Sequence, residues 1–393
     1  MLNKVQILGL FGMYNYTIDL WESSKKGLLF MTGPNGMGKS TVLRLINALY
    51  NKDFATLCEI EYKRIVFAFE PCTISLNREE KIVTIDTKSD VPSKKIIELA
   101  YHYQSVPKDG QSEFAESCSW TYTDSVLERS NDGKASTNSL DLLMESEKCL
   151  YIADNRLSQN NKDEVLYSPE HFRAFVERLK IQLSDAMVPI GPIEANWSEA
   201  LGERVATVEK QLQYLEKCGI EFPAQKEGLK SELKEVVWHA CRCCEHAFKT
   251  CSEEIQKLSL FKEFLEDSHL VDKELEISLR RGYRLISKNP NRTILSYDML
   301  SSGERHLIMQ LMMLLISPQK ISLVLIDEPE ISFHLMWQMQ YLERISKIQD
   351  IRKCSFLVAT HSTQIFDSHF EFTTDLWRQH KAEMDERKAN KEG

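Results

Sequence analysis

Residues 33–41, with the sequence Gly-Pro-Asn-Gly-Met-Gly-Lys-Ser-Thr, restrict the possible folds more than any other part of the chain. A short apolar run, residues 27–32, precedes them, and residues 40–50 carry apolar side chains at helical spacing. A glycine-rich turn between a strand and a helix lets backbone N–H groups surround a phosphate, and the helix dipole adds to the attraction. The segment therefore predicts a phosphate-binding loop in an α/β fold.

The candidate ATP-binding residues are those of this loop, Gly33, Pro34, Asn35, Gly36, Met37, Gly38, Lys39, Ser40 and Thr41. We expect Lys39 to neutralise the β- and γ-phosphates and Ser40 to place its hydroxyl on a Mg²⁺ ion. The alternative is a chance match in an ordinary glycine-containing loop. The strand and the helix that are predicted on either side argue against it.

A second apolar strand, residues 323–327, ends in two carboxylates and is followed by Pro329. A strand buried on both faces brings its last residue to the carboxyl edge of the sheet, where ligands of α/β proteins bind. Asp327 is therefore a candidate Mg²⁺ ligand, and Glu328 a candidate general base for an attacking water. A surface Asp-Glu turn is the alternative, and the phosphate loop elsewhere in the chain disfavours it.

The segment Leu300-Ser301-Ser302-Gly303-Glu304 stands directly before an apolar helix. It resembles the signature sequence of ABC ATPases, LSxGE. This resemblance implies that Ser301, Ser302, Gly303 and Glu304 complete, in trans, a site whose γ-phosphate is held by a second copy of the chain. A serine-led helix cap is the alternative, and both interpretations can hold at once.

The sequence Val358-Ala359-Thr360-His361-Ser362 is a further apolar strand that ends in a polar turn. It resembles the switch-histidine region of ABC ATPases, which implies that His361 contacts the γ-phosphate and joins Glu328 as a candidate catalytic residue. His334 falls where the D-loop of that family lies and is a candidate for an interface. For the Q-loop the sequence offers only Gln104 and Gln159, by position.

Composition excludes several classes of protein. Of the 393 residues, 42% are hydrophobic and 27% are charged, which is typical of a globular protein. The net charge of -9 disfavours a generally basic nucleic-acid-binding surface, although a local basic groove is compatible with it. We expect no membrane span and no secretory signal, and therefore a cytoplasmic protein with reduced cysteines. The cluster Cys241, Cys243, Cys244 and Cys251 has helical spacing that favours core packing over zinc binding.

The order of these patterns predicts an ATPase head interrupted by an insertion. Residues 1–193 and 279–393 are expected to form its two parts, with an antiparallel β lobe in the first and a charged tail, a frayed helix or disorder, at the end of the second. Residues 194–278 are expected to be a helical hairpin, because apolar residues from Leu201 to Leu215 are spaced like a coiled-coil seam. Residues 105–141 lack any steady period and predict an irregular, mobile loop or an excursion from the head.

The turn Leu10-Phe11-Gly12, the Asp-Glu-Pro-Glu run at 327–330 and the Ala-Thr-His-Ser run at 359–362 look like those of the AAA_15/AAA_21 group. That group lies on the SMC and OLD-like side of the ABC superfamily. The resemblance implies an α/β ABC ATPase head with a mixed sheet, ATP and Mg²⁺ as ligands, and a head-to-head homodimer or higher oligomer. The lack of a membrane segment argues against a transporter subunit.

Members of the AAA_15/AAA_21 group include ATPase subunits of phage-defence systems of the PARIS and Septu types. The resemblance implies a sensor or scaffold that holds or activates a separate effector, a Toprim- or HNH-type nuclease. The segment after His361 is too short for such a nuclease domain, which is why the effector is expected to be another chain. The alternative is an SMC-like repair ATPase that clamps DNA.

Overall fold

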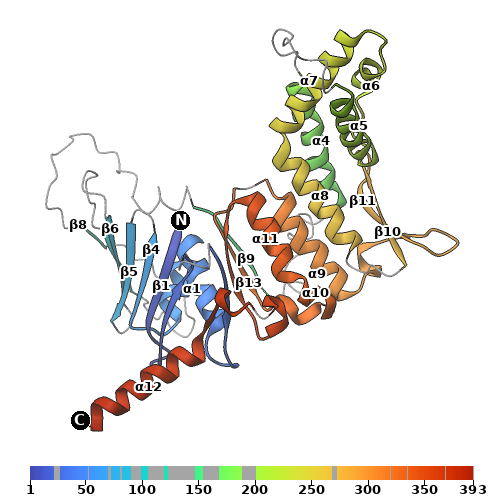
Figure 1. The fold of residues 1–393 in the computed structure, drawn as a ribbon. Coiled ribbons are helices and arrows are strands. Elements are labelled where there is room, and N and C mark those ends of the chain that lie inside the picture. Colours follow the sequence, from blue (N-terminus) through green and yellow to red (C-terminus); the bar gives the residue numbers. More distant parts are fainter. Residues whose placement is uncertain are drawn as a thin grey trace, which may run out of the picture. The chain divides into compact units, whose positions relative to one another are not determined.

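The computed structural model describes residues 1–21, 27–51, 53–69, 72–79, 82–89, 99–104, 119–122, 147–153, 168–187, 201–267, 272–318, 320–333, 335–367 and 369–392. The chain divides into two compact units, which are described separately (Figure 1). Unit 1 comprises residues 1–156 and 319–393, and unit 2 comprises residues 157–318. Unit 2 extends beyond the 194–278 segment singled out by the sequence, because helices on both sides of that segment pack with it.

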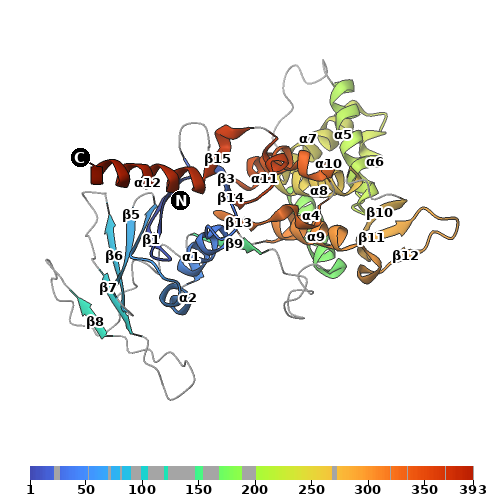
Figure 2. The same cartoon turned by 90° about the horizontal axis from the view of Figure 1, so that it is seen from below.

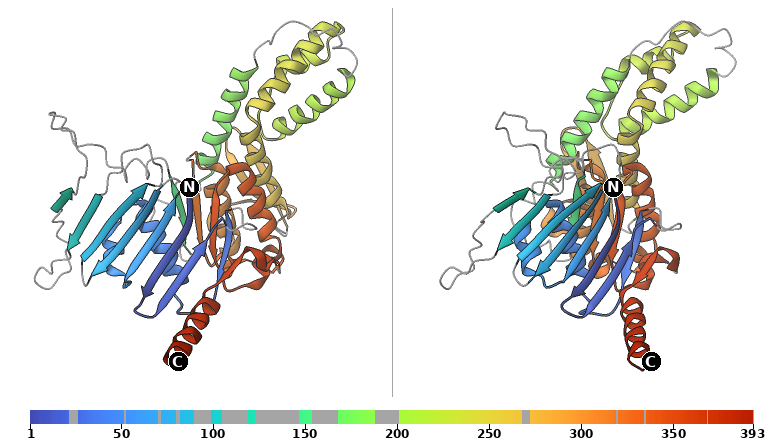
Figure 3. Two further views of the ribbon diagram at one scale, coloured as in Figure 1. Left: turned by 60° about the vertical axis from the view of Figure 1, so that its left-hand side comes forward. Right: turned by 90° about the vertical axis from the view of Figure 1, so that its left-hand side faces the viewer.

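An antiparallel sheet with the order β2-β1-β4-β5-β6-β7-β8 forms one layer of unit 1 (Figure 3). Its strands are β1 (Leu2–Leu10), β2 (Tyr14–Asp19), β4 (Arg64–Phe69), β5 (Cys72–Glu79), β6 (Ile82–Ser89), β7 (Leu99–Gln104) and β8 (Ser119–Tyr122). Strands β1 and β2 form an antiparallel hairpin at the N-terminus, with Ile7 opposite Tyr16.

One expectation about this sheet is wrong in part. Strand β8 lies inside the 105–141 segment that was expected to be an irregular loop, and it pairs with β7, with Trp120 opposite Tyr101. The sequence Ser-Trp-Thr-Tyr of β8 is rich in strand-forming side chains, a local signal that the polar composition around it concealed. The rest of the segment lies outside the described residues.

The second sheet of unit 1 is parallel, with the order β15-β3-β14-β13-β9. Its strands are β3 (Leu28–Thr32), β9 (Cys149–Ile152), β13 (Leu323–Asp327), β14 (Ser355–Ala359) and β15 (Thr373–Asp375). Strands β13 and β14 are buried along their whole length, as strands covered on both faces are. Parallel and antiparallel sheets together confirm the predicted mixed α/β fold class.

Helix α1 (Lys39–Asn51) lies in the core of unit 1 between the two sheets. Its apolar residues Val42, Leu43, Leu45, Ile46 and Leu49 join one core cluster with inward-facing residues of β1, β3, β13 and β14. Helix α2 (Phe54–Glu59) follows α1 and packs against it (Figure 2). This burial fixes the start of α1 against the carboxyl ends of the parallel strands.

The opposite face of the parallel sheet is covered by the segments that follow β13 and β14. The ring of Phe30 in β3 contacts the ring of Phe366 in the 3-10 helix Thr363–Phe366. That turn packs against α10 (Leu335–Met339) and α11 (Tyr341–Arg352). The turns at the ends of β13 and β14 are therefore held together by packing outside the sheet itself.

The charged tail begins as an anchored helix, α12 (Leu376–Glu392), rather than as disorder. Leu376 is fully buried, and the amide of Gln379 both accepts from the N–H of Thr17 (2.8 Å) and donates to its carbonyl (2.9 Å). Asn15 also donates to Glu383. Since β2 is the edge strand of its sheet, these bonds satisfy backbone groups that an edge leaves open.

Unit 2 contains helices and a small antiparallel sheet (Figures 1 and 2). They are α4 (Pro169–Ala186), α5 (Leu201–Lys217), α6 (Pro223–Leu229), α7 (Lys234–Thr250), α8 (Ser252–Glu266), β10 (Lys273–Ser278), β11 (Gly282–Ser287), β12 (Ile294–Leu295), the 3-10 helix Tyr297–Met299, α9 (Ser302–Leu311) and the π-helix Met312–Ile316. The chain reverses after α5, as expected. The short helix α6 ends at Leu229, and the longer helix α7 begins at Lys234.

Aromatic rings hold the base of unit 2 together. Phe172 of α4 lies 4.7 Å from Phe261 of α8 and 5.6 Å from Tyr283 of β11, measured between ring centroids. Gly282 has a φ of +70°, and a Cβ there would lie 1.9 Å from the carbonyl oxygen of Pro169. Only glycine therefore allows β11 to approach the start of α4 this closely.

Cys241, Cys244 and Cys251 of the cysteine cluster are buried, which confirms their expected packing as apolar residues. Burial raises the pKa of Cys241 to about 11 and that of Cys244 to about 12, so both remain protonated thiols at neutral pH. Among the helices that the structure describes, none has both the length and the apolar content needed to cross a lipid bilayer.

Candidate functional site

The glycine-rich loop joins β3 to α1 and is shaped by its glycines. Gly36 and Gly38 both have a φ of +81°, a conformation that side chains with a Cβ rarely adopt. A Cβ on Gly38 would also lie 3.0 Å from Leu10 and 3.1 Å from Phe11. Tyr16 of β2 donates a hydrogen bond from its hydroxyl to the Met37 carbonyl (2.9 Å), and burial raises the pKa of that hydroxyl. The loop is therefore tied to the antiparallel sheet.

Lys39 is buried at the start of α1, and its ammonium group turns back over the loop. It donates to the carbonyls of Gly33 (2.8 Å) and Pro34 (3.2 Å), and it lies 2.6 Å from Nε2 of His361. Burial lowers the pKa of Lys39, and the nearby carboxylates of Glu328, Asp327 and Glu330 oppose that shift. Because an ammonium can only donate, this contact requires a lone pair on Nε2 of His361.

Asp327 stands at the end of β13, opposite the start of α1. Its Oδ1 accepts a hydrogen bond from the Ser40 hydroxyl (3.1 Å), and its Oδ2 accepts one from Tyr151 (3.4 Å). A carboxylate and a hydroxyl at this separation form the oxygen-only donor set that Mg²⁺ prefers. The two residues that the sequence assigned to Mg²⁺ therefore lie side by side, and their chemistry fits the ion.

Glu328 follows Asp327 in a left-handed backbone conformation, with φ 44° and ψ 57°. This conformation is uncommon for a residue other than glycine, and such strain gathers at functional sites. The Glu328 N–H donates to the Ala359 carbonyl (2.9 Å), which ties the end of β13 to that of β14. Its carboxylate lies 3.5 Å from Nε2 of His361.

Sheet order explains why residues so far apart in the sequence meet. Strands β3, β14 and β13 are adjacent and parallel, and Ala359 is in register with both Met31 and Asp327. Their carboxyl ends form a single edge, which carries the residues that we call the nucleotide cleft: Lys39, Ser40, Asp327, Glu328 and His361.

Glu330 is a member of this neighbourhood that sequence reasoning missed. Its Oε1 accepts hydrogen bonds from the Thr360 hydroxyl (2.8 Å) and from the backbone N–H groups of His361 (2.7 Å) and Ser362 (3.2 Å). The Ser362 hydroxyl in turn donates to Gln338 of α10 (2.7 Å). No spacing rule in the sequence distinguishes Glu330 from an ordinary turn residue after Pro329.

Phe11, in the turn between β1 and β2, is a second residue whose position the sequence did not reveal. It has a φ of +52°, its ring lies beside Gly38 of the loop, and 37% of its surface is exposed. An exposed aromatic ring held by a strained turn against a phosphate loop can stack on a flat ligand group. The sequence does contain Leu10-Phe11-Gly12, but this segment indicated only a resemblance to a family and did not place the Phe11 ring beside the loop.

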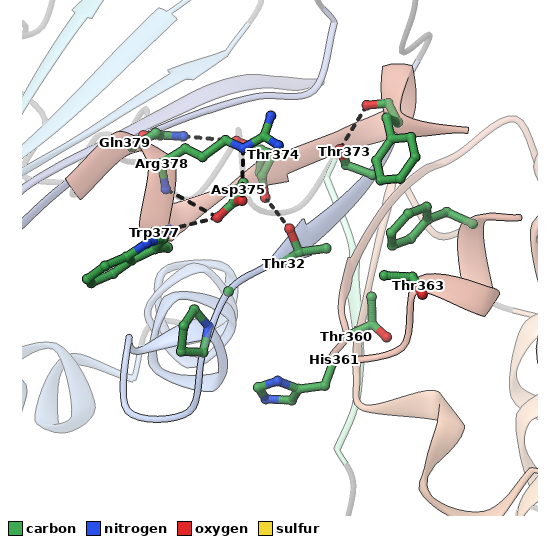
Figure 4. A pocket seen from close by; sticks show the side chains of 14 residues that line it. Thr32, Thr360, His361, Thr363, Thr373, Thr374, Asp375, Trp377, Arg378 and Gln379 are labelled. Atoms are coloured by element: carbon green, nitrogen blue, oxygen red, sulfur yellow. Dashed lines mark hydrogen bonds and ion pairs between the residues drawn. The ribbon is translucent and has the colours of Figure 1, made fainter. Parts of the chain in front are cut away.

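A pocket of about 810 Å³ lies beside the nucleotide cleft, within unit 1 (Figure 4). Thr360, His361 and Thr363 line one side. Asp375 at the end of β15 lines another, together with Trp377 and Arg378 at the start of α12. Gly33 and Pro34 of the loop also border it. The lining does not include Lys39, Asp327 or Glu328, so this pocket adjoins the cleft without being the cleft.

Ser301 to Glu304 belong to unit 2, where Ser301 caps helix α9. The Glu304 N–H donates to the Ser301 hydroxyl (3.3 Å), and the Ser301 N–H donates to the Glu304 carboxylate (2.8 Å), forming a capping box. Burial would raise the pKa of Glu304, but hydrogen bonds from Lys273 and Ser301 outweigh it and lower that pKa. The helix-cap interpretation is confirmed, while the role in trans stays a prediction.

Other sequence candidates gain little from the structure. Gln159 and His334 lie outside the described residues. Gln104 is the last residue of β7, where it pairs with Ile82 of β6. Neither Q-loop candidate therefore has a geometry that supports its assignment.

A phosphate loop between a strand and a helix, together with two carboxylates at the carboxyl end of another parallel strand of the same sheet, defines a P-loop nucleotide-binding protein. The family of AAA ATPase domains known as AAA_15 matches residues 1–366. The chain belongs to this family. Its membership agrees with the sequence resemblance to AAA_15 ATPases.

Solved structures with a similar course of the chain include two SMC heads. The Smc head domain with an extended coiled coil bound to the C-terminal domain of ScpA, from Pyrococcus furiosus, is 12% identical, with a TM-score of 0.39. That match covers 93% of this chain and 90% of the other. The SMC head domain from Thermotoga maritima is 11% identical, with a TM-score of 0.35, over 93% and 91% of the two chains. No curated protein sequence matches the chain.

Proposed function

We propose that the chain hydrolyses ATP with Mg²⁺ in the nucleotide cleft, and that two copies facing head to head complete each site. One observation supports the catalytic part of this proposal. Five residues converge at one edge of the parallel sheet, with contacts of 2.6 to 3.5 Å among them: Lys39, Ser40, Asp327, Glu328 and His361. Membership of an ATPase family supports the same reaction.

Each residue has a task that its geometry supports. The loop N–H groups and Lys39 bind the β- and γ-phosphates, and Lys39 would exchange its loop carbonyl contacts for phosphate oxygens. Ser40 and Asp327 hold Mg²⁺, which when bound neutralises charge on the β- and γ-phosphate oxygens. Glu328 accepts a proton from the attacking water, and His361 contacts the γ-phosphate.

Completion of the site in trans rests on the signature-like segment of unit 2. Ser301 and Ser302 are exposed at the start of α9, which is the positive end of the helix dipole. The Ser301 hydroxyl is bonded to Glu304 in the capping box and would exchange its bond to the carboxylate for one to the phosphate. In a two-fold dimer each copy would give its loop to one site and its Ser301 to the other.

Mixing two inactive variants tests the shared site. Lys39→Ala removes the loop cation, while Ser301→Asp keeps a good helix cap but sets a negative charge against the γ-phosphate. Each variant alone should be inactive. In a random mixture half of the dimers pair the two chains and carry one intact site, so activity should return to about a quarter of the wild-type level.

Two results would count against parts of this proposal. An inactive wild-type chain, with Mg²⁺ and ATP at millimolar concentration, would refute hydrolysis itself. Full activity of Ser301→Asp, or no recovery on mixing while the two variants still form dimers, would refute the site in trans. Sedimentation of the mixed sample supplies the dimer measurement.

For the biological role, we propose a sensor or scaffold whose nucleotide state holds or releases a separate effector protein. The sequence resemblance to defence ATPases supports this role, and the net charge of -9 fits it better than general binding to nucleic acid. Slow turnover and a stable complex with a neighbouring chain are expected. Hydrolysis stimulated severalfold by duplex DNA, with binding that weakens steeply as salt rises, would instead support the DNA clamp.

A further inference from the structure

We propose that Glu330 is a positioning residue for His361, a role that rests on the proposed ATPase function. The carboxylate does not act on the nucleotide. It fixes the backbone of the turn that carries the histidine, so that the imidazole stays between Lys39 and Glu328.

The hydrogen bonds of one carboxylate oxygen carry this inference. Glu330 Oε1 accepts three hydrogen bonds, from Thr360, His361 and Ser362, which are consecutive residues of the turn after β14. Two of the donors are backbone N–H groups, so the bonds fix the main chain rather than one side chain. Bonds to a charged acceptor are about twice as strong as neutral ones.

Further contacts hold both the segment that carries Glu330 and the turn that carries His361. Glu330 sits in the 3-10 helix Pro329–Ser332, directly after the strained Glu328, and the Ser362 hydroxyl is held separately by Gln338 of α10. Gln338 itself donates to the Phe333 carbonyl (3.1 Å). The turn that carries His361 is therefore fastened to the segment that carries Glu328, and the two catalytic candidates keep a fixed spacing.

A direct chemical role for Glu330 fits the structure less well. Its Oε1 is already engaged by three donors, and its Oε2 is buried with no hydrogen-bond partner in the part of the chain that the structure describes. The Mg²⁺ candidates Ser40 and Asp327 bond to each other, without Glu330. A carboxylate arranged in this way acts as an acceptor for the turn, not as a base or a metal ligand.

Three variants test whether the turn needs a hydrogen-bond acceptor or a negative charge at position 330. Glu330→Ala removes all three bonds, and we expect kcat to fall about 10- to 100-fold, because a misplacement of about 1 Å near the chemistry can cost that much. Glu330→Gln keeps an oxygen for the turn and should retain kcat within about threefold of wild type. Glu343→Ala, an exposed carboxylate on α11, is the matched control and should be silent.

A double-mutant cycle with His361→Ala tests whether Glu330 acts through the histidine. In the His361→Ala background, Glu330→Ala should lower kcat less than about twofold further, since the group that it positions is gone. The KM for ATP should change little in either background because the loop and Lys39 are intact. The proposal would be overturned if the reductions in kcat caused by Glu330→Ala and His361→Ala multiplied in the double variant. A kcat of Glu330→Gln as low as that of Glu330→Ala would also overturn it.

Amide hydrogen exchange provides a readout that does not depend on catalysis. The N–H groups of His361 and Ser362 should exchange faster in Glu330→Ala than in the wild-type chain, and at near wild-type rates in Glu330→Gln and Glu343→Ala. Unchanged exchange in Glu330→Ala would overturn the proposal even if hydrolysis is confirmed. Faster exchange in a chain that hydrolyses no ATP would instead locate the failure in the proposed function.

Discussion

Nζ of Lys39 lies 2.6 Å from Nε2 of His361, although the two residues come from the first helix and from the turn after β14. At this distance no phosphate oxygen fits between the two nitrogen atoms. If ATP binds as proposed, we expect the two groups to exchange this contact for contacts with the γ-phosphate. Two of the groups that are expected to bind ATP therefore contact each other in this structure.

Lys39→Ala tests the first of those groups. The substitution removes the ammonium that bonds to Gly33 and Pro34 and is expected to neutralise the phosphates. Because hydrogen bonds to charged groups are the strong ones, ATP affinity should fall about 100-fold or more. Titration calorimetry with MgATP measures the change. Lys347→Ala, an exposed lysine of α11, is the control, and unchanged affinity in Lys39→Ala would mean that the loop binds no triphosphate.

Glu328→Gln separates binding from hydrolysis. The amide keeps the size of the side chain but cannot accept a proton from water, so kcat should fall about 100-fold or more while ATP affinity stays near that of the wild type. If hydrolysis is what releases the proposed dimer, ATP should then trap the dimer of this variant. Single-turnover kinetics and sedimentation with MgATP measure the two effects. Rapid turnover in this variant would remove Glu328 from its assigned role.

Local motifs allowed much of the cleft to be predicted from sequence. The phosphate loop, the Asp-Glu pair and His361 each follow a strand, and parallel strands bring such residues to one edge of a sheet. The same reasoning could not find Glu330, whose partners Thr360 and Ser362 lie about 30 residues away and reveal themselves only when the turns meet. The Asp-Glu-Pro-Glu run that contains Glu330 indicated a family resemblance, but it gave no role for this residue.

Nonlocal contacts also explain why the charged tail forms an anchored helix. Residues of α12 are charge-rich and lack an apolar face, so composition favours fraying. What composition omits is the buried Leu376 and the two hydrogen bonds between Gln379 and Thr17 at the edge of the antiparallel sheet. Only a partner at the opposite end of the chain gives this helix its order.

Phe11→Ala tests whether the exposed ring beside Gly38 stacks on the base of the nucleotide. Stacking of a base on an aromatic ring contributes about 1 to 3 kcal/mol, so ATP affinity should fall about 5- to 150-fold. Affinity for inorganic tripolyphosphate, which has no base, should not change. Phe11→Tyr should bind ATP normally, and Met13→Ala, exposed on the same turn, is the control. Equal losses for both ligands would show that Phe11 only shapes the loop.

The ion pair between Arg204 and Glu245 predicts how the stability of unit 2 depends on pH. Nε of Arg204 donates to Oε1 of Glu245 (2.8 Å), a second guanidinium nitrogen contacts the other oxygen, and the pair joins α5 to α7. Hydrogen bonding from Arg204 lowers the pKa of Glu245 below its ordinary value of 4.5, against the opposing effect of burial. The charged carboxylate is therefore favoured in the folded state.

A carboxyl with a lowered folded-state pKa stabilises the fold above its unfolded pKa, and this contribution disappears as pH falls through the folded value. Glu245→Gln should therefore be less stable than the wild-type chain at pH 7, and the difference should shrink as pH falls below 4.5. Urea unfolding, followed by circular dichroism at both pH values, measures it. Glu263→Gln on α8 is the comparison variant. A stability difference for Glu245→Gln that stays constant from pH 7 to acid would show that packing, not charge, joins the two helices.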